Sequence, residues 1–386
     1  MPERINISAP HIDVDAAIVD IKKVLESGMM AQGPRVALAE KAMAAAFGAR
    51  YGIAYSNGTS SLRGALIAGL AAREGVGAAE VDRFIDGKQV IIPAFSFNAT
   101  LNSVVGAGGT ARVVDITESD YGIDRRRAES VTGSDTAAIM PVDLYGQAAD
   151  ISTEDNAFRG LTIIRDAAQA HGATLRGRPI VEHGHATSTS FYPTKNVAGG
   201  GEGGGILTND PNIDKVARWY RNQGMSAPYV YEMIGENARM TDIQAVILEL
   251  SLGGMVAANA RRRANAALLS EGLAAVPGIT LPQTHEGREH VWHQYTVTVD
   301  PDEFGMTRDD LRTRLDAHGI GCGIYYPKTM TNHPSYRDHP RIIKDPTPVA
   351  DEVAQRVLSL PVHPKVSPMD IERIVGTIEK IQRGEL

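Results

Sequence analysis

Leu161-Thr162-Ile163-Ile164-Arg165-Asp166 is a short, mainly apolar run that ends at a carboxylate. Such a run, without alternation, is typical of a strand that is buried on both faces of a sheet. Similar runs occur at residues 89–92, 111–115 and 137–140, and helical stretches separate them at intervals of roughly 25 residues. We therefore expect an α/β fold with a mainly parallel sheet flanked by helices. In such sheets ligands bind outside the carboxyl ends of the strands.

The segments on either side of these strands read mainly as helices. Residues 13–47 are expected to form two helices, interrupted at Ser27-Gly28 and Gly33-Pro34. A long helix is expected from Thr241 to about Leu273. Its basic cluster, Arg261-Arg262-Arg263, is interpreted as part of a solvated helix face.

After this helix the pattern changes to that of a small α+β domain. We expect a strand at residues 295–299, a helix capped by Thr307, a second strand at residues 321–326 and a closing helix at residues 368–381. A single core stops growing beyond roughly 250–300 residues. The predicted division is an N-terminal arm with a large α/β domain, residues 1–255, and a small C-terminal α+β domain, residues 256–386.

Composition narrows the possible partners and compartments. The 386 residues include 39 Lys+Arg and 46 Asp+Glu, giving a formal net charge of −7 without a run of like charges. We expect no nucleic-acid partner on this basis. The only cysteine, Cys322, excludes a disulfide or a cysteine-based metal cluster within one chain. No leader pattern or long apolar span is evident, so a cytoplasmic protein without a membrane partner is expected.

The turn Gly58-Thr59-Ser60 is a candidate anion site, because a helical pattern follows it directly. Free backbone N–H groups and the positive end of the helix dipole would face an anion there, with hydroxyls as further donors. The alternative is ordinary helix capping, since Ser and Thr cap helices in many proteins. Phe97, after the strand at residues 89–92, could stack on a flat ring, although a core position is the commoner use of Phe.

Asp166 stands where an apolar strand ends, and the small Ala167 and Ala168 follow it. A carboxylate in this place can accept a hydrogen bond from a protonated ring nitrogen and keep that ring cationic. Two alternatives remain open at this point, a helix cap and a metal site shared with His171.

Lys195 closes a hydroxyl-rich strand and precedes the glycine-rich residues 199–205. A partly desolvated lysine beside flexible backbone suits a Schiff-base amine, which must be neutral to attack a carbonyl. The glycines do not fit a dinucleotide-binding loop, because they follow the lysine and return to a strand instead of opening a helix.

Taken together, these motifs resemble the DegT/DnrJ/EryC1/StrS family of sugar aminotransferases, which are fold-type I enzymes that use pyridoxal 5′-phosphate. The resemblance covers about residues 25 to 380, and its pieces occur in family order: Ser56-Asn57-Gly58-Thr59, Asp166-Ala167-Ala168-Gln169-Ala170-His171-Gly172, Ser190-Phe191 with Lys195-Asn196, Asn237 with Arg239-Met240, Tyr325-Tyr326-Pro327 and Leu358-Ser359-Leu360-Pro361.

The resemblance implies a role for each matching residue. Lys195 and Asp166 match the catalytic pair, the lysine that binds the cofactor covalently and the acid beside the pyridine nitrogen. The other matches bind the cofactor: Gly58, Thr59, Ser60 and Ser190 at its phosphate, Phe97 on its ring, Gln169 near its phenolic oxygen, and Asn237 at the phosphate in the neighbouring subunit. No metal ligand is implied.

The implied activity is a ping-pong transfer of an amino group from an amino acid, with glutamate as the expected donor, to a keto-sugar that is nucleotide-linked. Pyridoxamine 5′-phosphate is the form of the cofactor between the two halves. A homodimer with active sites at the subunit interface is implied as well.

Three other functions are weighed against this one. A cyclitol or another secondary-metabolite ketone could be the acceptor, and the sequence hardly separates this from the leading hypothesis. A sugar dehydratase of the same fold would have a histidine in place of Lys195. A ligand-binding regulator would not need Lys195, Asp166 and Gln169 together. Asp143 departs from the histidine of many relatives, which leaves substrate-side details open.

Overall fold

The computed structural model describes residues 3–10, 12–73 and 76–386. Its centre is an eight-stranded sheet in the order β1-β9-β8-β5-β4-β2-β3-β15. The run from β15 to β8 is parallel throughout, while β9 is antiparallel to both β8 and β1. The strands span Tyr51–Tyr55 (β1), Gln89–Pro93 (β2), Thr110–Val114 (β3), Thr136–Ile139 (β4), Thr162–Asp166 (β5), Ala186–Ser190 (β8), Gly204–Thr208 (β9) and Ile342–Lys344 (β15). The expected α/β fold is confirmed.

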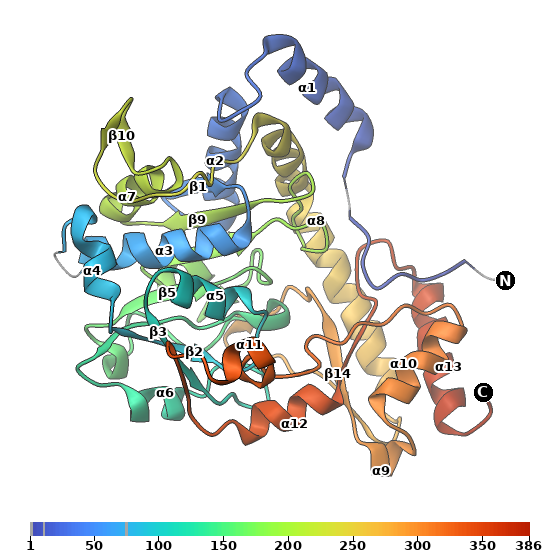
Figure 1. The fold of residues 1–386 in the computed structure, drawn as a ribbon. Coiled ribbons are helices and arrows are strands. Elements are labelled where there is room, and N and C mark those ends of the chain that lie inside the picture. Colours follow the sequence, from blue (N-terminus) through green and yellow to red (C-terminus); the bar gives the residue numbers. More distant parts are fainter. Residues whose placement is uncertain (1–2, 11, 74–75) are drawn as a thin grey trace.

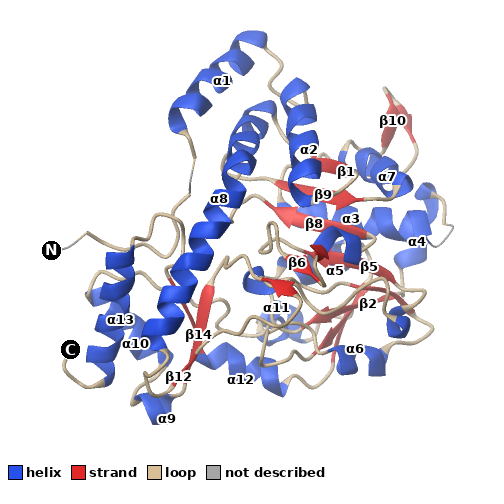
Figure 2. Ribbon diagram, turned by 180° about the vertical axis from the view of Figure 1, so that it is seen from behind, coloured by secondary structure: helices blue, strands red, loops and turns tan. Residues whose placement is uncertain are grey.

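Helices cover both faces of this sheet, as Figures 1 and 2 show. Neighbouring strand residues belong to different cores, because successive side chains of a strand point to opposite faces. Ile164 packs with residues of α3 (Gly58–Arg73), α5 (Ala99–Gly106) and α7 (Pro211–Arg221), whereas Ile163 packs with Ala128 of α6 (Arg125–Val131). Burial on both faces explains why β2 to β5 read as continuous apolar runs.

The two predicted N-terminal helices are α1 (Val14–Ser27) and α2 (Pro34–Phe47). The predicted long helix is α8 (Asp242–Leu273). It begins with a capping box formed by Thr241 and Gln244. By length and composition α8 could cross a membrane, but it packs along α2, α1 and α13 (Pro368–Gln382) as a core helix.

The C-terminal part packs against the far half of α8 (Figure 1). It contains the antiparallel sheet β12-β14-β16, formed by Ile279–Thr280, Tyr295–Val299 and Val357–Leu360, with α10 (Arg308–Ala317) and α13 over it. As predicted, Thr307 caps α10 by accepting from the Asp310 N–H. The remaining elements of the described residues are α4 (Val81–Ile85), β6 (Thr174–Leu175), β7 (Arg178–Pro179), β10 (Met225–Ala227), β11 (Val230–Tyr231), β13 (Arg288–Glu289), α9 (Pro301–Phe304), α11 (Pro334–Arg337), α12 (Pro348–Arg356) and five short 3-10 turns.

The division of the chain at residue 255 stays a prediction. That position falls inside α8, and β15 of the C-terminal part joins the large sheet. The carboxylate of Asp115, at the end of β3, also accepts from the N–H groups of Val349 and Ala350 in α12.

The strand predicted at residues 321–326 is wrong. Only an isolated bridge joins Gly323 to Ser359 of β16 in this segment. The backbone leaves the small sheet there because its two tyrosines contact the large sheet's loops. Tyr145 donates its hydroxyl to the carbonyl of Tyr325, and Gln169 donates to the hydroxyl of Tyr326.

Candidate active site

The predicted site residues lie at one edge of the large sheet. Asp166 ends β5, Lys195 follows β8, Phe97 follows β2 and Gly58 opens the helix after β1. Because β1, β2, β5 and β8 all run in the same direction, their carboxyl ends meet at this edge.

Gly58 lies directly against Ser190. A Cβ built on Gly58 would lie 2.6 Å from the Ser190 Cβ, so only glycine leaves this space open. Asn57 shapes the turn by accepting from the Ser60 N–H through its side chain (2.9 Å). The first N–H groups of α3, from Gly58 and Thr59, stand at the end of a 16-residue helix. Such a helix end, with the half-buried hydroxyls of Thr59, Ser60 and Ser190 beside it, suits a phosphate.

Asp166 is buried, with 6% of its surface exposed, and its carboxylate is oriented by two donors. The Thr100 hydroxyl donates to Oδ2 (2.8 Å) and the Ala168 N–H donates to Oδ1 (3.2 Å). Burial raises the pKa of Asp166, and the bond from Thr100 is the strongest influence in the opposite direction. A positively charged ring nitrogen beside this carboxylate would favour its ionised form.

Lys195 is half-buried in the loop that follows β8. Burial lowers the pKa of Lys195 to about 8, while the negative charge of Asp166 works against that shift. The neutral amine is therefore accessible near physiological pH, as a Schiff-base amine requires.

The backbone after Lys195 is held by side chains from distant segments. His171 Nδ1 accepts from the Val197 N–H (3.0 Å), and Ser251 of α8 accepts from the Ala198 N–H (2.9 Å). The Asn196 side chain donates to Asn259 Oδ1 (3.0 Å). These bonds hold the loop against α8 and the segment after β5, and no hydrogen bond to the Lys195 amine is present among the described residues.

The metal hypothesis for His171 is not supported by its contacts. Its Nδ1 accepts from Val197, and its Nε2 lies 2.7 Å from the Thr189 hydroxyl. Both ring nitrogens are therefore used within the protein. Burial lowers the pKa of His171 to about 3, so the ring is neutral.

Gln169 and Phe97 both lie beside Tyr326. Gln169 accepts from the Tyr145 N–H (2.9 Å) and donates to the Tyr326 hydroxyl (3.1 Å). The Phe97 ring centre is 6.0 Å from that of Tyr326, and 58% of the Phe97 surface is exposed. Phe97 is thus not a core residue, and its exposed face is free to cover a ring.

Asn237 lies on the strand-like segment that follows the β10–β11 hairpin. Its backbone pairs with Asn222, and the next residue, Ala238, accepts from the Ser56 N–H (2.8 Å). The Asn237 side chain is exposed and has no hydrogen-bond partner among the described residues. The segment therefore runs beside the residues that lead into the Gly58-Thr59-Ser60 turn of its own chain, and the side-chain amide of Asn237 is exposed at the surface.

Arg262 corrects the interpretation of the basic cluster on α8. It is buried and donates to the carbonyls of Trp292 (3.0 Å) and His293 (3.3 Å). Burial lowers the pKa of Arg262 to about 10. Asn259, Arg262 and Asn265, spaced three positions apart on α8, form a buried polar stripe in which Arg262 and Asn265 donate to carbonyls of the C-terminal part.

Sequence reasoning gave no role to three polar residues that the structure places at the site. Thr100 contacts Asp166, Tyr326 contacts Gln169, and His293 lies 3.3 Å from Asn196 through its Nδ1. Each contact joins segments far apart in the chain, so no local pattern indicates it.

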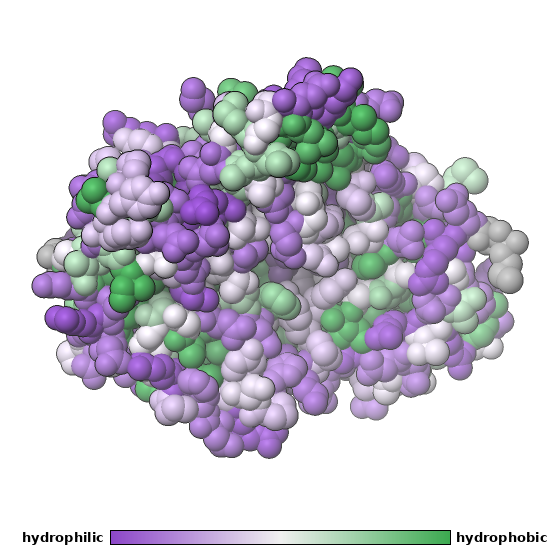
Figure 3. Space-filling model, turned by 45° about the horizontal axis from the view of Figure 1, so that its top comes forward, coloured by the Kyte–Doolittle hydropathy of each residue, from purple (hydrophilic) through white to green (hydrophobic). Residues whose placement is uncertain are grey.

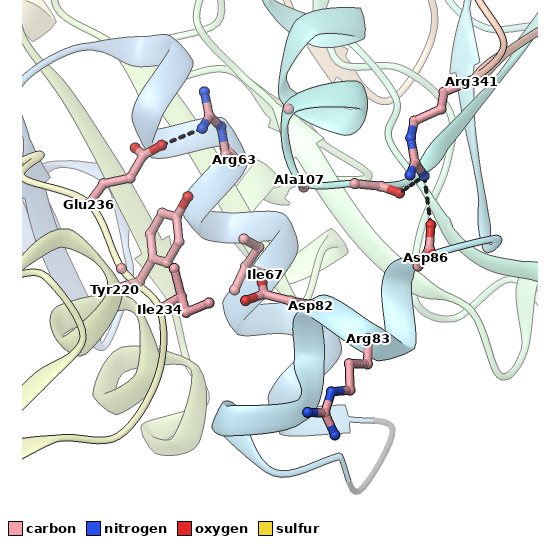
Figure 4. A pocket seen from close by; sticks show the side chains of 13 residues that line it. Arg63, Ile67, Asp82, Arg83, Asp86, Ala107, Tyr220, Ile234, Glu236 and Arg341 are labelled. Carbon is pink, nitrogen blue, oxygen red and sulfur yellow. Dashed lines mark hydrogen bonds and ion pairs between the residues drawn. The ribbon is translucent and has the colours of Figure 1, made fainter.

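A cavity of about 500 Å³ lies outside this site along α3 (Figure 4). Arg63 of α3 forms an ion pair there with Glu236, the residue before Asn237. The Arg63 guanidinium also lies against Gly106. The helix that opens at Gly58 is thus tied by its second turn to the segment that carries Asn237.

Comparison with known proteins identifies the relatives of this chain. The family model described as the DegT/DnrJ/EryC1/StrS aminotransferase family matches residues 12–379. A dTDP-3-amino-3,4,6-trideoxy-alpha-D-glucose transaminase from Streptomyces venezuelae is 34% identical, over 96% of this chain and 95% of that protein. A UDP-N-acetyl-3-dehydro-alpha-D-glucosamine 3-aminotransferase from Acidithiobacillus ferrooxidans is 31% identical, over 98% and 99%.

Solved structures agree with this assignment. S. venezuelae DesV in complex with a ketimine intermediate matches with a TM-score of 0.85 and 32% identity, over 98% of this chain and 99% of that one. NtdA from Bacillus subtilis with bound pyridoxamine phosphate matches with a TM-score of 0.84 and 27% identity, over 96% and 82%.

Proposed function

Because this chain belongs to the DegT/DnrJ/EryC1/StrS aminotransferase family, whose members depend on pyridoxal phosphate, we propose that it transfers an amino group from glutamate to a nucleotide-linked keto-sugar. The two half-reactions share one site in a ping-pong order. The observation that carries the proposal is the pair of Lys195 and Asp166 at one sheet edge, with a lysine pKa of about 8.

The residues at this edge fit the cofactor. Gly58 leaves open the space that a Cβ would fill beside Ser190, at the end of α3. Each oxygen of Asp166 accepts one hydrogen bond from the protein, and a carboxylate oxygen can accept a second one. The bound group supplies the electron sink that stabilises negative charge on the substrate carbon.

The protein's own groups then have separable tasks. The end of α3 with Ser190 would bind the phosphate, and Asp166 would hold the ring nitrogen protonated. Lys195 would hold the cofactor covalently through its amine, and as a free amine it would move a proton at the substrate carbon. A general acid–base works best with a pKa near the working pH, and that of Lys195 is about 8.

The acceptor class is drawn from the relatives. The two named above act on a dTDP-linked and a UDP-linked sugar, so the shared chemistry is an amino group on a nucleotide-linked hexose. The panel of keto-sugars that tests this proposal therefore varies both the nucleotide and the position of the keto group.

We further propose a cytoplasmic homodimer with sites at the subunit interface. An apolar surface on α1 and the following turn supports an interface with a second copy, because monomers rarely expose large contiguous apolar patches. Figure 3 shows a hydrophobic patch at the top of the molecule, where α1 lies in Figure 1, and exposed apolar side chains of this segment contribute to it. They are Val14, Ile18, Val19, Leu25, Met29 and Met30, each at least 49% exposed.

The test separates the two half-reactions. The purified enzyme is first converted to its pyridoxamine form with each amino acid of a panel, which identifies the donor by the change in cofactor absorbance. That form is then mixed with nucleotide-linked keto-sugars and with cyclitol ketones. Return of the original absorbance with a nucleotide keto-sugar is expected. Return with cyclitol ketones alone would assign the other acceptor class, and no conversion by any amino acid would contradict the aminotransferase proposal.

A further inference from the structure

Two buried hydroxyls form a chain that ends on Asp166. The Ser96 Oγ lies 2.9 Å from the Thr100 Oγ1, and Thr100 Oγ1 lies 2.8 Å from Asp166 Oδ2. The exposed fractions of Ser96, Thr100 and Asp166 are 4%, 0% and 6%. Ser96 and Thr100 flank Phe97, so one segment carries both hydroxyls and the exposed aromatic ring.

The direction of donation in this chain follows from proton counting. A hydroxyl has one proton to donate, and an ionised carboxylate can only accept. Thr100 therefore donates to Asp166, and its lone pairs accept from Ser96. In the first turn of a helix a Thr hydroxyl commonly bonds to nearby backbone instead. Thr100, in the first turn of α5, directs its hydroxyl across to β5.

The second oxygen of Asp166 accepts from the Ala168 N–H. With one donor on each oxygen the plane of the carboxylate is fixed, and one acceptor position on each oxygen is left. The two residues that follow, Ala167 and Ala168, have small side chains. The Ala168 bond comes from the neighbouring backbone, so Thr100 is the side chain that decides the orientation.

We propose that Thr100, supported by Ser96, is a positioning residue that keeps Asp166 ionised and turned toward the ring nitrogen of pyridoxal phosphate. This inference rests on the proposed role of Asp166. Without the Thr100 hydroxyl, burial of the carboxylate is opposed by one donor fewer, so Asp166 takes up a proton more readily and its contact with the ring nitrogen weakens.

The test measures ligand binding, not turnover. Pyridoxamine 5′-phosphate binds without a covalent link, and its dissociation constant can be followed by fluorescence. Thr100→Val keeps the shape of the side chain without the hydroxyl and should weaken this binding about tenfold, as expected for one charge-assisted hydrogen bond. Thr100→Ser should restore it to within about twofold. Binding of the 1-deaza analogue, which has C–H in place of the ring nitrogen, should not change with either variant.

The matched control is Ser103→Ala. Ser103 is a buried hydroxyl of the same helix that donates to the Thr100 carbonyl (2.8 Å) and does not contact Asp166. It should leave the dissociation constant unchanged. In the apoprotein, the infrared band of the Asp166 carboxyl, assigned by Asp166→Asn, should show protonation at higher pH in Thr100→Val than in the wild type.

The outcomes separate the inference from the proposed function. If Thr100→Val binds pyridoxamine phosphate as the wild type does while Asp166→Asn binds it weakly, the inference on Thr100 is overturned and the site stands. If Asp166→Asn itself binds and reacts as the wild type, the proposed role of Asp166 fails. Should Thr100→Val not fold, Ser96→Ala decides, because a smaller weakening in the same direction supports the chain and no change refutes it.

Discussion

Asp143 and Arg165 form an ion pair in which neither side chain is exposed to solvent. Arg165 Nε donates to Asp143 Oδ2 (3.1 Å), and the rest of the guanidinium donates to Asp143 Oδ1 and to the carbonyls of Ala149 (2.9 Å) and Ile151. Asp143 also accepts from the Ala149 N–H (2.9 Å). Asp143, in the segment after β4, thus forms a structural pair with Arg165 of β5, next to Asp166, and both of its carboxylate oxygens are hydrogen-bonded there.

Breaking this pair should destabilise the protein strongly. Asp143→Ala leaves the Arg165 charge buried without its partner, and we expect a loss of about 3–5 kcal/mol in the free energy of unfolding. The matched control is Asp150→Ala in the exposed pair with Arg176, which should cost less than about 1 kcal/mol. Urea denaturation measures both. A loss for Asp143→Ala as small as that of the control would show that the pair contributes little.

Lys195 is expected to carry the cofactor covalently. Borohydride reduction followed by peptide mapping should place the adduct on this residue. Lys195→Ala should retain the fold and some cofactor affinity while transamination falls by about 10³-fold or more, since the covalent link and the proton shuttle are both lost. An adduct on a different lysine would refute the assignment.

The lowered pKa of Lys195 predicts a pH dependence for covalent uptake of the cofactor by the apoprotein. Only the neutral amine attacks the aldehyde, so the rate should rise about tenfold per pH unit below the pKa and level off near pH 8. Stopped-flow absorbance gives this profile. A rate that continues to rise to pH 10 would show that the amine keeps an ordinary lysine pKa.

Asp166→Asn should retain the cofactor that is covalently linked to Lys195, although it binds free pyridoxamine phosphate more weakly, and should slow the proton-transfer step by about 10²-fold or more. An amide cannot stabilise positive charge on the ring nitrogen as a carboxylate does, so the electron sink weakens. Single-turnover absorbance with the amino donor measures this step apart from product release. Near wild-type rates in this assay would reduce Asp166 to a helix-cap or packing role.

The parts of this protein that the sequence predicts are those with a local pattern. Ile163 and Ile164 belong to a strand that is buried on both faces, so the parallel sheet and the position of Asp166 at its end follow from the run itself. Arg262 is buried because Trp292 and His293, thirty residues later, present their carbonyls to it. No local charge pattern contains that information.

The same distinction explains the wrong strand and the missed site residue. Residues 321–326 have a strand-like composition, but the Tyr326 hydroxyl accepts a hydrogen bond from Gln169, 157 positions earlier. Thr100 reads as an ordinary residue of a helix start, and its contact with Asp166 arises because β2 and β5 lie on either side of β4 in the sheet. Contacts between distant segments decide such residues, and one sequence alone does not reveal them.

The last prediction concerns the subunit that uses Asn237. Its side chain is exposed and has no hydrogen-bond partner among the described residues, and its backbone runs beside the segment that leads into Gly58. We therefore expect its amide to be available to the site of a partner subunit. Two proteins, Lys195→Ala and Asn237→Ala, are mixed under conditions that allow subunit exchange. If Asn237 acts across the interface, the mixed dimer has one site with both residues intact and should recover up to about half the wild-type activity per dimer. The control mixture, Lys195→Ala with Asp166→Asn, should recover nothing, because both of those residues serve their own subunit's site. If neither mixture recovers activity, although mass spectrometry proves subunit exchange and Asn237→Ala alone has a strong defect, Asn237 serves the site of its own subunit.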